Sequence, residues 1–254
     1  MKVVDTKFVT VQDPHSVNND SEFVTNQVSG GVREKQYAFD FVFDENAEQK
    51  AVFEQTTKFL IEGITDGFNA SVFAYGATGA GKTYTMLGKP KDQGIFGYTF
   101  EELFINMETQ SKEKEFKIKM SFIEIYNENI YDLLLQGEKP LELREDATKG
   151  IHVSGVSEIR AESTKEVLEL LHIGNQNRST ESTDANDESS RSHAILLVTV
   201  EHKERDAGTE ADVKVGKFSL IDLAGSERAS NTNNTGIRMV EGANINKSLL
   251  ALGN

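Results

Sequence analysis

The sequence contains no cysteine, only three prolines, and five histidines. Without cysteine the chain has neither a disulfide framework nor a thiolate metal site. The histidines form no His-Glu-x-x-His pair, which argues against a zinc hydrolase. No apolar run reaches the length of a transmembrane helix and no signal peptide opens the chain, so we expect a cytoplasmic or nuclear protein outside the membrane.

Positive charge is scarce as well. The chain carries 27 lysines and arginines against 41 aspartates and glutamates, a formal net charge of −14. A nucleic-acid-binding protein is usually basic, so DNA and RNA are not expected partners. The 254 residues suffice for one large α/β domain with a substantial core. No internal repeat, low-complexity tract or linker divides the chain, so we expect a single domain over residues 1–254.

One stretch matches a phosphate-binding loop without a mismatch: Gly76-x-x-x-x-Gly81-Lys82-Thr83. An apolar run over Ser71–Tyr75 predicts a buried strand directly before it, and the pattern allows a helix from Gly81. Glycines let backbone N–H groups turn inward around an anion, and the helix N-terminus adds partial positive charge. Lys82 can then reach the β- and γ-phosphates, and the Thr83 hydroxyl can ligate Mg²⁺. The alternative is a glycine-rich turn without a ligand, which the complete motif in its strand–helix context disfavours.

Strands and helices alternate through much of the chain, which predicts a layered α/β domain with a central, mostly parallel sheet and helices on both faces. The expected elements, besides those of the phosphate loop, are strands over Phe8–Gln12 and Gln36–Phe43, a helix over Ala47–Ile64, a helix with an apolar stripe from Phe96 to Met107, a strand over Lys117–Tyr126, a helix from the capping box Ser163–Glu166 to about Asn175, and a hairpin of strands over Ser192–Val200 and Val213–Leu223. In Gln36–Phe43 the aromatic residues alternate, as in a half-buried strand.

Two further stretches have the chemistry of a nucleoside triphosphatase. An apolar strand ends at Asp222, the expected form of an acid that holds a Mg²⁺-bound water, and the N–H of Gly225 can face a γ-phosphate. The polar loop Asn186–His193 offers hydroxyls for metal and phosphate, and Arg191 can pair with an acid. The alternatives are an aspartate that caps a turn and an ordinary polar surface loop, and composition alone does not decide between them.

These stretches together resemble a kinesin motor domain, from about Gln36 to Asn254. The motifs that carry the resemblance are Ala74–Met86, Asn186–His193, Asp222–Arg228 and Glu241–Asn254. The phosphate loop, the Met86-Leu-Gly88 after it and Arg144-Glu-Asp146 look most like the eighth kinesin class, whose members walk to microtubule plus ends and limit their growth.

The resemblance implies a P-loop NTPase of the kinesin motor fold that uses ATP and Mg²⁺ and moves along microtubules or regulates their plus ends. It implies that Arg191 and Glu227 bridge two switch segments around ATP, and that Tyr84 lies beside the adenine. The implied site residues are, for catalysis, Ser189, Ser190, Arg191, Asp222, Gly225, Glu227 and Asn246; for nucleotide binding, Gly76, Ala77, Thr78, Gly79, Ala80, Gly81, Lys82, Thr83 and Tyr84; and for the metal, Thr83, Ser190 and Asp222.

The chain also departs from the family pattern. It lacks the Arg-x-Arg-Pro segment expected near the start of a kinesin motor, and it stops at Asn254 within the expected tubulin-docking helix, so we expect an incomplete motor fragment. One alternative is a truncated kinesin-like protein that binds nucleotide without motility. Another is a different P-loop NTPase such as a GTPase, although Asn246-Lys-Ser-Leu249 lacks the acid of a guanine-binding motif.

The resemblance implies tubulin as the partner. The acidic charge balance and the lack of a long apolar run lead us to expect no nucleic acid and no membrane as partners. The resemblance places the protein in the cytoplasm on the microtubule cytoskeleton, with the spindle as one candidate location. It leaves open a homodimer of the full-length protein, formed through segments absent here.

Overall fold

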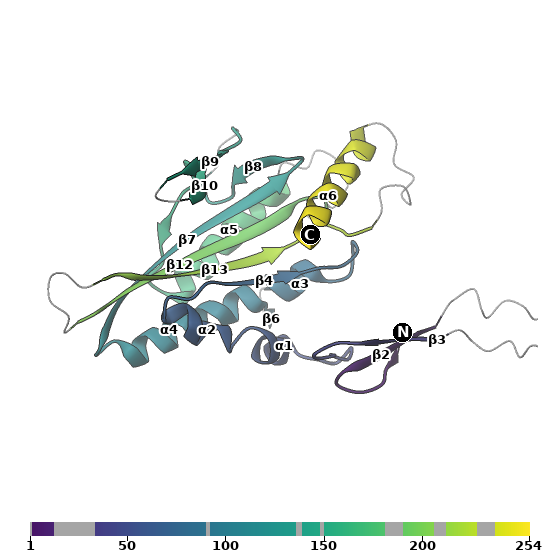
Figure 1. Ribbon diagram of the computed structural model, residues 1–254, viewed down its shortest axis with the longest axis horizontal. Helices are drawn as coiled ribbons and strands as arrows, with labels where there is room; N and C mark the ends of the chain where they lie inside the picture. The colour runs from purple at the N-terminus through teal and green to yellow at the C-terminus, as the bar shows by residue number, and fades with distance from the viewer. Residues whose placement is uncertain are drawn as a thin grey trace, which may run out of the picture.

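The computed structural model describes residues 2–12, 34–89, 92–135, 139–147, 150–180, 190–205, 212–227 and 237–254. Its centre is a six-stranded sheet in the order β11 (Ile159–Arg160), β7 (Lys114–Tyr126), β12 (His193–Glu204), β13 (Lys214–Asp222) and β4 (Ala70–Ala74), with β8 (Asn129–Asp132) also paired to β7 (Figure 1).

The sheet is mixed, and the prediction that it is mostly parallel is wrong. Within the described strands only β13 and β4 pair in parallel, while β12 pairs antiparallel with both β7 and β13. The physical reason is the connection between strands. A short connection such as that from β12 to β13 closes an antiparallel hairpin, whereas a parallel pair needs a long crossover, and β4 and β13 are far apart in the sequence.

Helices lie on both faces of the sheet, as predicted. The first face carries α1 (Gln49–Thr56), α2 (Leu60–Thr65), α4 (Ile95–Gln110) and α5 (Thr164–Thr180). Their buried side chains form one core with alternate residues of the strands. This core includes Phe96, Phe100 and Leu103 of α4 and Met120, Phe122, Leu196, Val198, Phe218 and Leu220 of the strands. The other face contacts α6 (Ile237–Gly253) near one end, because His193, which alternates with the core-facing residues of β12, bonds to Ser248 of this helix.

The predicted helix over Ala47–Ile64 is two helices, α1 and α2, because the chain turns between Thr56 and Leu60. The Thr56 hydroxyl donates to the Val52 carbonyl oxygen, a local bond that competes with the helical ladder and favours a helix end. Thr57 then leaves the helical conformation at φ −120°.

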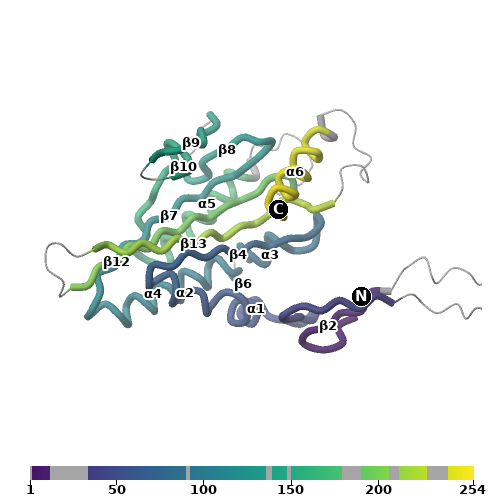
Figure 2. The backbone as a smooth tube through the Cα atoms, viewed as in Figure 1, coloured from purple at the N-terminus to yellow at the C-terminus, as the bar shows by residue number. Residues whose placement is uncertain are grey.

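The predicted strand over Gln36–Phe43 is shorter than expected. It ends at Ala38, where β3 (Glu34–Ala38) pairs with β2 (Phe8–Gln12), which also pairs with β1 (Lys2–Val3). This three-stranded sheet lies beside the main body rather than in the central sheet (Figure 2). Its aromatic face is therefore exposed rather than half-buried, with Tyr37 47% and Phe39 56% accessible.

The helix α5 begins as predicted and runs further. The backbone N–H of Glu166 donates to the Ser163 hydroxyl (3.3 Å), and the Glu166 carboxylate accepts from the N–H of Glu162 (3.2 Å), which satisfies free donors of the first turn. The helix continues to Thr180 instead of about Asn175, and this extension carries Arg178 into the interior.

The remaining elements are short: α3 (Lys82–Met86), β5 (Gly88–Lys89) and β6 (Asp92–Gln93) after the phosphate loop, and the hairpin of β9 (Glu142–Asp146) and β10 (Gly150–Ser154). Among the helices that the structure describes, none has the length and apolar character to span a bilayer.

Candidate functional site

The phosphate loop joins the end of β4 to the start of α3, as the motif predicts. Gly79 and Gly81 have φ values of +77° and +92°, in the left-handed region that favours glycine. The Lys82 side chain is 9% exposed, and its Nζ donates to the Ala77 carbonyl oxygen at 3.0 Å. The loop therefore curls back on itself with a cation and a helix N-terminus at one point.

Asp222 lies beside this loop because β13 runs parallel to β4, with Asp222 paired to Ala74 in the register. The Thr83 hydroxyl donates to Asp222 Oδ2 at 2.7 Å. Asp222 is fully buried, and its Oδ1 has no hydrogen-bond partner among the described residues. Two of the three predicted metal-binding residues, Thr83 and Asp222, which are 139 residues apart in the sequence, are thus in direct contact.

Arg178 is a site residue that the sequence reasoning missed. It is 1% exposed, and its Nη1 donates to Asp222 Oδ2 at 2.7 Å. Its Nη2 and Nε donate to the carbonyl and the hydroxyl of Ser192, and Nε lies 3.8 Å from the buried carboxylate of Glu124. A buried cation needs such partners, since an uncompensated one would be strongly destabilising.

The sequence does hold a signal for Arg178. The core-facing positions of α5 include Val167, Leu171 and Gly174, and the next position at helical spacing is Arg178. An arginine on the buried stripe of a helix indicates a buried acid opposite, but the signal is visible only if the helix is extended past Asn175.

Residues 223–226, which we call the connector, form a second group of contacts beside the phosphate loop. Four successive N–H groups donate to four different acceptors: Leu223 to the Ala74 oxygen (3.4 Å), Ala224 to His193 Nδ1 (3.1 Å), Gly225 to the Ser190 oxygen (2.7 Å) and Ser226 to the Gly76 oxygen (3.1 Å). The predicted residues Ser190 and Gly225 are thus brought together beside the loop.

A side chain at Gly225 would require Thr78 and Glu227 to shift. A Cβ there would lie 2.4 Å from the Thr78 hydroxyl and 2.5 Å from the Glu227 carboxylate. Ser189, the other serine predicted for this site, lies outside the described residues.

The implied bridge between Arg191 and Glu227 is not present. Glu227 accepts from the N–H of Thr78 (2.9 Å) and from its hydroxyl (2.5 Å). Arg191 Nη1 donates instead to Glu241 on α6 at 3.0 Å, and Glu241 also accepts from the Tyr126 hydroxyl at 2.7 Å. Each of the two side chains is therefore held by a partner other than the predicted one.

The electrostatics of Glu227 agree with these contacts. Burial opposes its charged form, but the hydrogen bonds from Thr78 and the nearby Lys82 outweigh burial and lower the pKa of Glu227. The carboxylate is thus ionised beside the phosphate loop, where backbone N–H groups and a lysine already favour negative charge.

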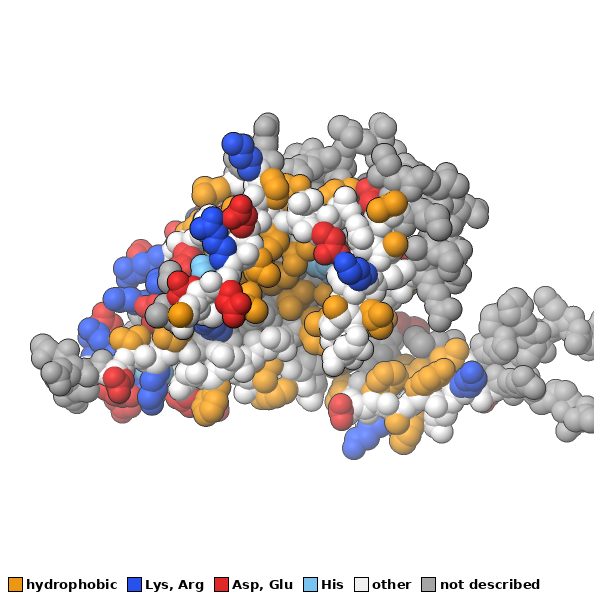
Figure 3. Space-filling model, turned by 45° about the horizontal axis from the view of Figure 1, so that its top comes forward, with side chains coloured by type: hydrophobic (Ala, Val, Ile, Leu, Met, Phe, Trp, Pro, Cys, Tyr) orange, Lys and Arg blue, Asp and Glu red, His pale blue; other side chains and the backbone are white. Residues whose placement is uncertain are grey.

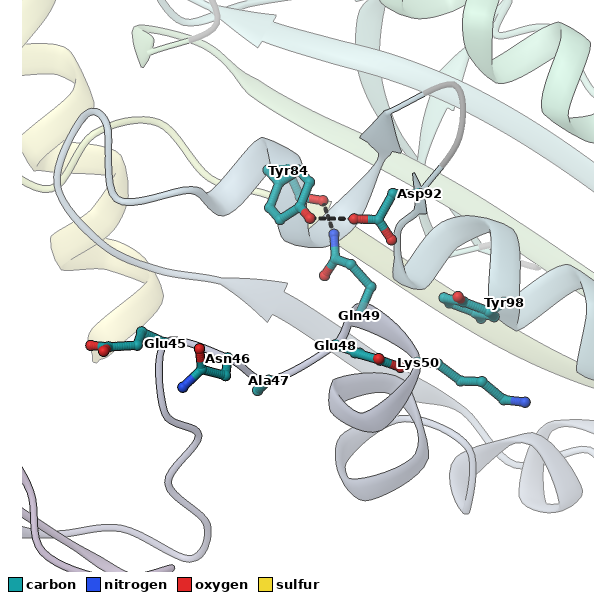
Figure 4. A pocket seen from close by; sticks show the side chains of 9 residues that line it. All are labelled: Glu45, Asn46, Ala47, Glu48, Gln49, Lys50, Tyr84, Asp92 and Tyr98. Atoms are coloured by element: carbon teal, nitrogen blue, oxygen red, sulfur yellow. Dashed lines mark hydrogen bonds between the residues drawn. The ribbon is translucent and has the colours of Figure 1, made fainter.

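Tyr84 lies on α3 at a polar pocket of about 360 Å³ (Figure 4). Its hydroxyl donates to Asp92, which raises the pKa of Tyr84, and its backbone oxygen accepts from Gln49 Nε2 at 2.5 Å. Lys89 Nζ lies 5.1 Å from the ring centroid, a cation–π contact. The other lining residues are Glu45, Asn46, Ala47, Glu48, Lys50 and Tyr98. The pocket is therefore lined by an aromatic side chain that is fixed by hydrogen bonds and lies on the helix that follows the phosphate loop.

Asn246, the last predicted catalytic residue, lies half-buried on α6, and its side chain makes no hydrogen bond to another described residue. On the face shown in Figure 3, lysine and arginine side chains are interspersed with aspartates and glutamates.

Comparison with known proteins matches the model of the kinesin motor domain to residues 3–254. The chain is 49% identical over 251 residues to the kinesin-like protein KIF19 of Xenopus laevis, covering 99% of this chain and 25% of that protein. It is 50% identical to kinesin-like protein 5 of Schizosaccharomyces pombe (91% of this chain, 26% of that protein) and 50% identical to KIN-8A of Arabidopsis thaliana (87% and 30%). The chain thus spans about a quarter of the length of the curated relatives it matches.

Among solved structures, the chain resembles a KIF14 dimer in a two-heads-bound state with AMP-PNP, in complex with a microtubule. The TM-score is 0.78 at 33% sequence identity, covering 97% of this chain and 68% of that one.

Proposed function

The chain belongs to the kinesin motor domain family, and from this premise we propose that it binds and hydrolyses ATP as the motor domain of a microtubule motor. The relatives KIF19 and KIN-8A are of the eighth kinesin class, which confirms the resemblance that the sequence predicts. The observation that carries the proposal is the hydrogen bond between Thr83 and Asp222, because it joins the phosphate loop to the acid of a separate strand.

The phosphate loop supplies the binding groups. Lys82 is nearly buried at the start of α3, so its charge faces bound phosphate with little competition from water. One acceptor of Lys82 is the neutral carbonyl of Ala77, which a phosphate oxygen replaces at a gain in charge-assisted bonding. The backbone of Gly76–Gly81 completes the cradle, and we assign residues 76–84 to nucleotide binding.

The residues fit a magnesium ion. Asp222 Oδ1 is a buried acceptor without a partner among the described residues, and the Thr83 hydroxyl is beside the same carboxylate. The described part of the chain has no cluster of three or more His, Cys, Asp or Glu side chains that could hold a metal alone. We therefore assign Thr83, Ser190 and Asp222 to an ion that shares its ligands with phosphate and water. When bound, Mg²⁺ neutralises phosphate charge.

The switch residues act through exchange of partners. Gly225 N–H now bonds to the Ser190 oxygen, and it must leave that oxygen to reach a γ-phosphate. In our proposal Glu227 likewise leaves Thr78, and Arg191 leaves Glu241, when the two form a bridge that orders water for hydrolysis. We assign Ser189 and Asn246 to the same step from the resemblance alone.

The pocket at Tyr84 suits the base of the nucleotide. An aromatic ring held at its hydroxyl by Asp92 and at its backbone by Gln49 offers a fixed surface for stacking.

Microtubules are the proposed partner, and the cytoskeleton the proposed location. The described surface includes exposed apolar side chains on α6 (Leu250, 66%) and on the β9–β10 hairpin (Ile151, 72%), which are suited to contact with a protein surface.

Steady-state hydrolysis tests the proposal. We expect a complete motor domain that contains this chain to hydrolyse ATP, microtubules to accelerate the reaction, and GTP to compete poorly with ATP. Equal competition by GTP would favour a different P-loop NTPase, and binding without turnover would favour a non-motile kinesin-like protein.

A substitution at Gly225 sharpens the same test. Gly225→Ala places a Cβ against Thr78 and Glu227, so turnover is expected to fall at least about tenfold while ATP still binds. Gly253→Ala, at a position with open space around it, is the matched control and should leave turnover unchanged.

A further inference from the structure

The side chain of His193 is buried between the connector and α6. It is 7% exposed at the start of β12, on the face of the sheet that contacts α6. Its Nδ1 accepts from the N–H of Ala224 at 3.1 Å, and its Nε2 lies 2.8 Å from the Ser248 hydroxyl oxygen. Both ring nitrogens therefore have a partner, one from each of two separate elements.

The partners determine the tautomer. A backbone N–H can only donate, so Nδ1 of His193 carries no proton and Nε2 does. The Nε2–H group then donates to the Ser248 hydroxyl, which donates in turn to the Ile245 carbonyl oxygen at 2.8 Å. Burial, together with Arg178, lowers the pKa of His193, which agrees with a neutral ring.

The connector is the segment that must move for the nucleotide site to change. Gly225, next to Ala224, has to turn its N–H from the Ser190 oxygen toward phosphate. Of the four connector hydrogen bonds, three end on backbone carbonyls of β4, the phosphate loop and Ser190. The fourth ends on a side chain, His193, which continues to α6.

From this geometry we infer that His193 is a positioning residue that couples the connector to α6, with Ser248 as its contact on the helix. The inference rests on the proposed function, because it concerns how nucleotide binding at the site changes the position of α6 against the sheet. If the connector moves, the acceptor for Ala224 must follow or lose its bond, and either result changes the hydrogen bond that holds Ser248.

The chain offers a matched control. Asn244, also on α6, donates to Asn127 at 2.7 Å, and Asn127 belongs to the turn after β7 rather than to the nucleotide site. Ser248→Ala and Asn244→Ala each remove one side-chain hydrogen bond that holds α6, but only the first interrupts the path to Ala224. Ser248→Thr retains the hydroxyl and should restore parental behaviour.

The experiment is hydrogen exchange of the α6 amides in the chain with ADP and with AMP-PNP, alongside titration of both nucleotides. We expect both alanine variants to speed α6 exchange by about three- to tenfold. The difference between the two nucleotides should be lost in Ser248→Ala and kept in Asn244→Ala and Ser248→Thr. A nucleotide difference of parental size in Ser248→Ala would overturn the inference.

Two readouts separate this inference from the proposed function. If the parent chain binds neither nucleotide, the proposed function fails; if it binds them and Ser248→Ala responds like the parent, only the coupling fails. The ¹⁵N spectrum of the histidine rings provides an independent check, with His193→Gln to assign its signals. A protonated Nε2 and an unprotonated Nδ1 are expected at His193, and the opposite tautomer would contradict the coupling path.

Discussion

The phosphate loop and the side chains of Arg191 and Glu227, which we assign to the same site, are built in different ways. In the loop, two left-handed glycines, the end of β4 and the start of α3 determine where Lys82 and Thr83 lie. The charged groups of Arg191 and Glu227 instead lie at the ends of long, flexible side chains. Arg191 is bonded to Glu241, and Glu227 is bonded to Thr78.

This difference separates binding from switching. A backbone cradle is the same before and after the ligand arrives, so it contributes affinity at little cost in reorganisation. Side chains with two competing partners can change state when a ligand alters the balance between them. We therefore expect substitutions in the loop to change affinity and substitutions at the exchanging acids to change turnover.

The largest expected effect comes from Lys82→Ala, which tests whether the phosphate loop provides the affinity for ATP. Removal of a nearly buried cation from the phosphates should weaken ATP binding about 100-fold, measured by titration calorimetry. Lys58→Ala, which removes a surface ion pair to Glu102, is the control and should bind ATP as the parent does. Parental affinity in Lys82→Ala would show that this loop does not hold the phosphates.

The paired variants Glu227→Gln and Glu241→Gln test whether Arg191 exchanges one carboxylate partner for the other. Glu227→Gln removes the charge that Arg191 needs, so single-turnover hydrolysis should slow about 10- to 100-fold with little change in ATP affinity. Glu241→Gln removes the competing charge for Arg191, so hydrolysis should stay the same or quicken a few-fold. Equal losses in both variants would contradict the exchange of partners.

What the sequence could predict follows the same division. The loop, Asp222 and Gly225 were predictable because backbone motifs with fixed spacing encode them. The partner of Arg191 was not, since a nearby carboxylate on α6 competes with the implied one and the sequence does not state which is closer. The role of Arg178 was not predictable in the same way, because its signal depends on where α5 ends and helix ends are poorly encoded in sequence.

The fold shows the same contrast. The helix α4 and the long strands β7, β12 and β13 follow from strong periodicity in the sequence. The direction of strand pairing does not, because periodicity is the same in parallel and antiparallel strands, and the mixed sheet depends on how the strands are connected.

The smallest expected effect concerns the far end of β12, where His202 is buried with neither ring nitrogen bonded to a described residue. Burial lowers the pKa of His202, and Lys114 and Lys214 lower it further. The folded protein therefore excludes a proton that the unfolded chain takes up near pH 6.5, so the stability is full above that pH and falls below it.

His202→Leu should raise the free energy of unfolding by about 1–2 kcal/mol, since an unpartnered buried polar ring is replaced by an apolar side chain. It should also reduce the loss of stability between pH 7 and pH 5.5, measured by thermal unfolding. The same substitution at the exposed His172 is the control. A pH dependence as steep as that of the parent would show that His202 is not the group that titrates.

The most direct test of the proposed site is an ATP titration of the parent, Thr83→Ser and Thr83→Ala, each with Mg²⁺ and with a chelator. Because Thr83 bonds to Asp222 and is assigned to the metal, the parent and Thr83→Ser should lose affinity by the same factor when Mg²⁺ is removed. With Mg²⁺, Thr83→Ala should bind ATP about 10- to 100-fold more weakly than the parent, and its affinity should change little when Mg²⁺ is removed. A full magnesium dependence in Thr83→Ala would contradict the assignment of this hydroxyl and this acid to the nucleotide site.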